Sequence, residues 1–63
     1  MEATDFQFIV GKPLKEAIEA VKPYYITETN VDGESLYISA QYDKRRLQVE
    51  TRRGIVSKVV MIG

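Results

Sequence analysis

The sequence predicts a small α+β domain with a single helix packed on a short sheet. An amphipathic stretch near the amino terminus has the spacing of a helix. Three later segments, rich in β-branched, aromatic and apolar residues, have the character of strands and cover residues 24–29, 46–50 and 55–63. A chain of 63 residues supports one hydrophobic core, so we expect one domain over residues 1–63.

The helix is expected to begin at Pro13, because a proline is tolerated in the first helical turn. Apolar residues then recur at helical spacing at Leu14, Ala17, Ile18 and Val21. Pro23 ends the helix, since the residue before a proline is disfavoured in the α region. The result is a helix of about ten residues, roughly 15 Å long. Residues 1–9, which precede it, are expected to be loosely ordered.

The stretch from residue 35 to residue 42 leaves two architectures open. Leu36, Ile38, Ala40 and Tyr42 alternate as one face of a strand would. With a strand there, the chain after the helix is a four-stranded antiparallel meander. Alternatively, the strands at 24–29 and 46–50 lie parallel, and residues 30–45 form the long connection that parallel neighbours require. Long connections in small domains are usually functional.

Composition narrows the function before any motif is considered. The chain has no cysteine and no histidine, which removes thiolate metal sites and the usual proton shuttle at neutral pH. We therefore expect no enzyme activity, no cofactor and no metal. The amino terminus carries no leader and no apolar run long enough for a membrane span, so we expect a cytoplasmic protein without membrane contact.

Net charge is zero at pH 7, but the charges are unevenly distributed along the chain. Residues 1–36 hold seven acids and three lysines, whereas residues 37–63 hold six bases and two acids. The basic half contains the cluster Lys44, Arg45 and Arg46. This cluster, together with Tyr37 and Tyr42, could bind phosphates and stack on bases. The acidic first half weakens attraction to a polyanion, which makes nucleic acid the less favoured partner.

Two long stretches of the chain resemble the potato inhibitor I family, and especially its short, cysteine-poor microbial members. These stretches are "VGKPLKEAIEAVKP" and "DGESLYISAQYDKRRLQVETRRGIVSKVVMIG", which together extend from Val10 to Gly63. The resemblance implies one helix on a small mixed sheet with a protruding loop within residues 30–45. It also implies a serine protease inhibitor. The alternative is a non-inhibitory protein-interaction module of the same fold.

In the register of that family, Ile38, Ser39, Ala40, Gln41 and Tyr42 form the protease-contact loop. Ala40 then enters the primary pocket of the protease, with Ile38 as the rival residue. A small apolar residue in that pocket favours elastase-like or subtilisin-like targets over trypsin. The bracing residues are Arg46, which props the loop from the adjoining strand, and Lys44 or Arg45 as a second prop.

Rigidity is what distinguishes an inhibitor of this kind from a substrate. Without disulfides, we expect it to come from hydrogen bonds between Arg46 and the side chains of Ser39 and Gln41, because a planar guanidinium holds two acceptors well. The family usually has an acidic residue at the position of Gln41 and a capping serine at that of Pro13. The neutral amide predicts a weaker brace, and the missing hydroxyl predicts a helix start less stable by about 1 kcal/mol.

Overall fold

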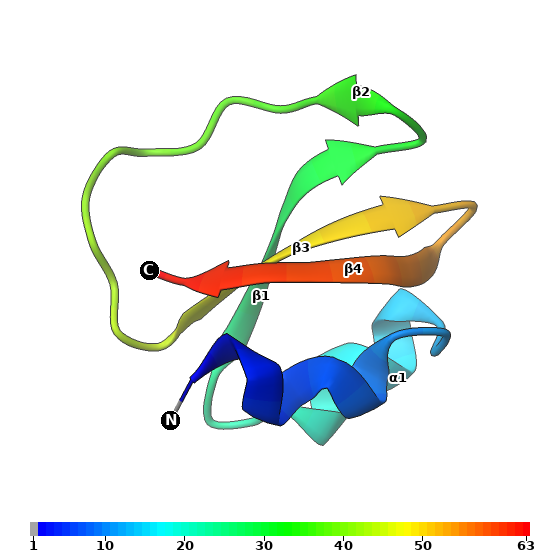
Figure 1. Ribbon diagram of the computed structural model, residues 1–63, viewed down its shortest axis with the longest axis horizontal. Helices are drawn as coiled ribbons and strands as arrows, with labels where there is room; N and C mark the ends of the chain where they lie inside the picture. The colour runs from blue at the N-terminus through cyan, green and yellow to red at the C-terminus, as the bar shows by residue number, and fades with distance from the viewer. Residues whose placement is uncertain (1) are drawn as a thin grey trace.

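The structure, a computed structural model, describes residues 2–63 and consists of two helices and a four-stranded sheet. The elements along the chain are the 3₁₀-helix η1 (Ala3–Ile9), the α-helix α1 (Leu14–Ala20) and the strands β1 (Tyr25–Val31), β2 (Glu34–Ser35), β3 (Arg46–Arg52) and β4 (Ile55–Ile62). Both helices lie on one face of the sheet, and a long loop arches away from them between β2 and β3 (Figure 1).

The sheet is mixed, with the strand order β2-β1-β3-β4. β1 and β3 are parallel neighbours, whereas β2 pairs antiparallel with β1, and β4 pairs antiparallel with β3. The antiparallel meander is therefore wrong. Within residues 35–42, which alternate as a strand would, only Ser35 belongs to a strand. The α+β class and the mixed sheet with a long connection are confirmed.

The amino-terminal segment differs from the loosely ordered stretch that we expected, because it forms η1. A 3₁₀-helix has three residues per turn, so Ala3, Phe6 and Ile9 share one face. Phe6 and Ile9 are buried, and Ala3 packs partly against the same core. The N–H of Glu2 donates to the Asp5 carboxylate at 2.9 Å and satisfies a donor at the start of the helix. The prediction of a single helix was therefore incomplete.

α1 is shorter than expected and ends at Ala20, before Pro23. Its first N–H, from Leu14, donates to the carbonyl oxygen of Gly54 at 2.8 Å. The β3–β4 turn thus satisfies one of the N–H groups at the start of the helix that have no intrahelical partner. Ala17 is buried, whereas Ile18 is 40 % exposed, so the apolar stripe is narrower than predicted. Neither helix within residues 2–63 has the length and apolar character needed to cross a membrane.

The core lies between the helices and the sheet. Its buried members come from η1, from α1 and the residue after it, and from the strands β3 and β4: Phe6, Ile9, Ala17, Val21, Leu47, Val49, Val56 and Val59. Leu47 and Val49 alternate along β3 toward the helices, as the sequence predicts for a half-buried strand. Thr51 continues this face and is also buried, donating a 2.6 Å hydrogen bond to the Glu28 carboxylate.

Candidate functional site

The candidate site is the loop of residues 36–45, which connects β2 to β3. The last ladder bond before it runs from the N–H of Leu36 to the carbonyl oxygen of Thr29 at 2.9 Å. The loop then leaves the sheet edge, arches around the carboxyl end of β4 and returns to the start of β3 (Figure 1). Because β1 and β3 are parallel, the chain must return from the end of β1 to the opposite end of the sheet before β3 begins. The loop covers most of that distance.

The loop has little apolar packing beneath it. A hollow of about 310 Å³ lies between the loop and the sheet, lined on the sheet side by Met61, Gly63 and Gln48. Ser39, Ala40 and Gln41 are exposed, as are the rings of Tyr37 (93 %) and Tyr42 (74 %), whereas Ile38 is half-buried. Because few buried apolar contacts hold this segment, its hydrogen bonds decide how stiff it is.

Arg46 supplies these hydrogen bonds from the first position of β3. Its side chain is only 9 % exposed and reaches under the loop. The Nη2 group donates to the carbonyl oxygens of Ser39 at 3.2 Å and Gln41 at 2.7 Å. The Nε group donates to the carbonyl oxygen of Gly63 at 2.6 Å. One guanidinium therefore ties two points of the loop to the end of β4.

Gly63 is itself fixed from two further directions. Its N–H donates to the carbonyl oxygen of Arg46 at 2.9 Å, and its carbonyl oxygen also accepts from the Gln48 amide at 2.8 Å. Gly63 is buried, and a Cβ at this position would lie 2.9 Å from Met61 and 3.5 Å from the Tyr42 ring. The contacts with Gly63, at the end of β4, thus fix the Arg46 side chain in the position from which it bonds to the loop.

The loop acceptors are main-chain carbonyls and not the side chains that the sequence suggested. The Gln41 side chain has no hydrogen bond within residues 2–63, and the Ser39 hydroxyl instead accepts from the Gln41 N–H at 3.3 Å. Every residue has a carbonyl, so this kind of brace depends little on the side chain at position 41. The neutral amide of Gln41 therefore does not weaken the contact with Arg46 in the way that we expected.

A second anchor holds the base of the loop through Asp43, which sequence reasoning missed. The Tyr25 hydroxyl, on β1, donates to one oxygen of the Asp43 carboxylate, and the N–H of Arg45 donates to the other at 2.9 Å. The main chain adds two bonds: Arg46 N–H to Asp43 carbonyl at 3.1 Å, and Tyr25 N–H to Arg45 carbonyl at 2.9 Å. An Asp side chain that accepts from the N–H two residues later is a known turn signal, so the bond to Arg45 could have been found from the sequence. The bond to Tyr25 could not, because Tyr25 lies far from Asp43 in the sequence.

The electrostatics of this anchor follow from its hydrogen bonds. The bond from the Tyr25 hydroxyl, followed by that from the Arg45 N–H, holds the pKa of the Asp43 carboxyl below its usual value, and the charge of Arg46 adds to this effect. The same carboxylate, by accepting the hydroxyl proton, raises the pKa of Tyr25. Asp43 is therefore ionised and Tyr25 protonated at neutral pH, which preserves the anchor.

Lys44 and Arg45 do not brace the loop with their side chains, because neither side chain has a hydrogen bond or an ion pair within residues 2–63. Both are exposed. They line a groove of about 450 Å³ with Tyr42, Tyr24, Pro23 and Ile62. Of the three cations predicted to brace the loop, Arg46 alone does so in the part of the chain that the structure describes.

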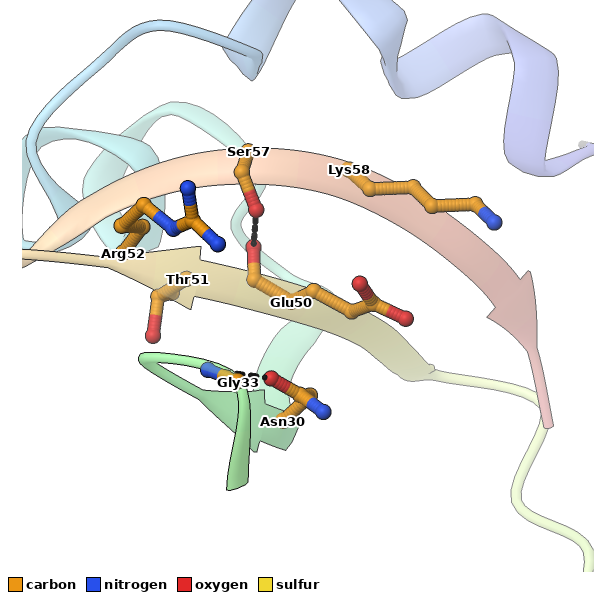
Figure 2. A pocket seen from close by; sticks show the side chains of 7 residues that line it. All are labelled: Asn30, Gly33, Glu50, Thr51, Arg52, Ser57 and Lys58. Carbon is orange, nitrogen blue, oxygen red and sulfur yellow. Dashed lines mark hydrogen bonds between the residues drawn. The ribbon is translucent and has the colours of Figure 1, made fainter. Parts of the chain in front are cut away.

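A further hollow is lined by residues of β1, β3, β4 and the β1–β2 turn, and Figure 2 shows these residues. Its polar groups are partly engaged with each other: Ser57 donates to the carbonyl oxygen of Glu50 at 3.1 Å, and the Gly33 N–H donates to Asn30 at 2.9 Å. Glu50 and Lys58 extend side by side with opposite charges (Figure 2). In residues 2–63, no group of three acidic side chains is placed to hold a metal ion.

Comparisons of the chain with models of protein families, with curated proteins and with solved structures found no match. The chemistry of the loop is therefore the basis for a functional conclusion. It is an exposed segment outside the helices and strands, and its main chain is held at two carbonyls by a buried cation and at its base by a carboxylate.

Proposed function

We propose that this protein is a serine protease inhibitor that presents residues 38–42 to the active site as a rigid, substrate-like segment. The proposal includes an architecture of the potato inhibitor I type. It is supported by the parallel pairing of β1 and β3, the long loop in the connection between them and the arginine that follows the loop. Elastase-like or subtilisin-like enzymes are the favoured targets, since Ala40 suits a small or apolar primary pocket.

The observation that carries the proposal is the position of the two braced carbonyls. With Ala40 in the primary pocket, the bond exposed to attack joins Ala40 to Gln41. The Nη2 group of Arg46 holds the carbonyl of Ser39 on one side of that bond and the carbonyl of Gln41 on the other. If the protease cleaves the bond, both new ends remain tied to one nitrogen. They stay close enough to rejoin, because their effective concentration is high.

Holding the loop before binding also strengthens binding. A flexible peptide loses conformational freedom when a protease orders it, at about 0.5–1.5 kcal/mol per immobilised side chain and about 1–2 kcal/mol per residue of backbone. In this protein, folding has already restricted the loop through Arg46 and Asp43. A larger part of the contact energy is then available as affinity.

Burial favours Ala40 over Ile38 as the residue that enters the primary pocket. That residue must be free to leave the inhibitor surface, and Ala40 is exposed between the two braced carbonyls. Ile38 is half-buried and lines the hollow above Met61. Moving Ile38 into a protease would expose apolar surface inside the inhibitor itself.

Titration against elastase, subtilisin, chymotrypsin and trypsin tests the proposal. We expect inhibition of elastase or subtilisin by the native chain, and Ala40→Lys should transfer inhibition to trypsin. Ile38→Lys, the matched control, should not inhibit trypsin. If Ile38→Lys acquires trypsin inhibition and Ala40→Lys does not, the register is wrong. If neither the native chain nor either variant affects any of the four enzymes, the inhibitor proposal is refuted and an interaction module becomes the better explanation.

A further inference from the structure

We infer that the groove lined by Tyr42, Lys44 and Arg45 binds an acidic surface on the target protease, beside the pocket that receives the residues after the exposed bond. This inference rests on the proposed function and adds a partner chemistry to it. Apart from Tyr42, which both contain, the groove lies outside the segment that enters the active site. It would select among proteases with the same primary specificity.

The geometry places the groove on one side of the loop. Tyr42 belongs both to the contact segment and to the groove wall, so the groove begins where the contact segment ends. Tyr24, the residue before β1, and Ile62, the last residue of β4, also line the groove. A protease bound at Ala40 and Gln41 would therefore bring its surface for the later residues over Lys44 and Arg45.

The charges in the groove are not compensated. The only ion pair in residues 2–63 joins Lys22 to Glu19, on and just after α1. Asp43 is the nearest acid in sequence, and its carboxylate is already bonded to Tyr25 and to the Arg45 main chain. Lys44 and Arg45 both line the groove and are exposed, so two cations are available there to a partner.

The expected chemistry combines charge with aromatic surface. Carboxylates of the partner would bond to the Arg45 guanidinium and the Lys44 ammonium, while the Tyr42 and Tyr24 rings cover apolar atoms between them. Contacts between exposed charges mainly accelerate association and weaken with salt. The inference thus predicts a specific kinetic signature, which a purely shape-based fit to the active site would not produce.

The test compares two double variants that lose the same charge. Lys44→Gln with Arg45→Gln removes the groove cations, and Arg52→Gln with Lys58→Gln removes two cations from the hollow in Figure 2, which lies outside the loop. All four side chains are exposed, so both variants should fold. The measurement is the association rate constant with the protease that the native chain inhibits best, at low and high salt.

We expect the groove variant to associate about tenfold more slowly at roughly 10 mM salt, where the Debye length is about 30 Å. At about 1 M salt, where it is about 3 Å, the difference should fall below about twofold. The control variant should remain within about twofold of the native rate at both salt concentrations.

Equal association rates for the native chain and the groove variant at roughly 10 mM salt would overturn the inference and leave the inhibitor proposal standing. Equal slowing by the two double variants would also overturn it, because net charge would then suffice. Salt-dependent retardation of a single-stranded oligonucleotide, lost in the groove variant while inhibition is unchanged, would assign the groove to nucleic acid instead. Absence of inhibition by the native chain would refute the proposed function itself.

Discussion

Replacing Arg46 by alanine is the most informative single perturbation of the loop. The change removes three hydrogen bonds donated by a cation, to Gly63, Ser39 and Gln41. A hydrogen bond to a charged group typically contributes about 1.5–3 kcal/mol. The Ser39 and Gln41 carbonyls can rebind water, because their residues are exposed, whereas Gly63 is buried. We therefore expect a loss of about 2–4 kcal/mol in the free energy of unfolding, mostly from the contact with Gly63.

The effect of Arg46→Ala on inhibition comes from the loop main chain that it releases. Two positions of the loop main chain become free and must be ordered again by the protease, at about 1–1.5 kcal/mol each. The sum, about 2–3 kcal/mol, corresponds to an inhibition constant about 30- to 150-fold weaker. The freed loop should also be hydrolysed faster, because the cut ends are no longer held together.

The assay measures the inhibition constant with a chromogenic substrate and follows loop cleavage by mass spectrometry. Arg52→Ala is the matched control, since Arg52 lies on the same strand, is exposed and has no side-chain hydrogen bond within residues 2–63. Arg46→Lys should be intermediate, because an ammonium lacks the planar fork that spans two sets of acceptors. An Arg46→Ala protein that folds, inhibits as tightly as the native chain and is cleaved no faster would refute the bracing mechanism.

Two further predictions concern the side chains beside the brace. The pKa of Asp43 is lowered, so this residue adds stability that is present above about pH 4 and is lost as the pH falls through its pKa in the folded protein. The pKa of Tyr25 is raised, so this residue adds stability that is present below about pH 10 and is lost as the pH rises through its pKa in the folded protein. The stability difference between the native chain and Tyr25→Phe in denaturant melts should therefore be largest between these limits, and a difference independent of pH would contradict the anchor. Gln41→Ala and Gln41→Glu should each change the free energy of unfolding by less than about 0.5 kcal/mol, as exposed substitutions usually do; a clear gain with glutamate would show that this side chain reaches Arg46.

The sequence by itself determined the elements whose signals are local. Leu47 and Val49 alternate with polar residues, and this period of two correctly predicted the buried face of β3. The Arg53-Gly54 turn was also predicted correctly, since both residues take the positive φ that glycine favours. Pro13 marked the start of α1. In each case, a few neighbouring residues carry the whole signal.

Only the tertiary structure decided how the strands pair and which atoms brace the loop. The alternation of apolar residues looks the same in parallel and antiparallel strands, so the sequence could not show that β1 and β3 are parallel. The alternation from Leu36 to Tyr42 therefore left the antiparallel meander open. Arg46 was identified from the sequence, but its acceptors could not be, because a main-chain carbonyl leaves no mark in the side-chain pattern. The bond from Tyr25 to Asp43 joins residues that become neighbours only once β1 and β3 lie parallel.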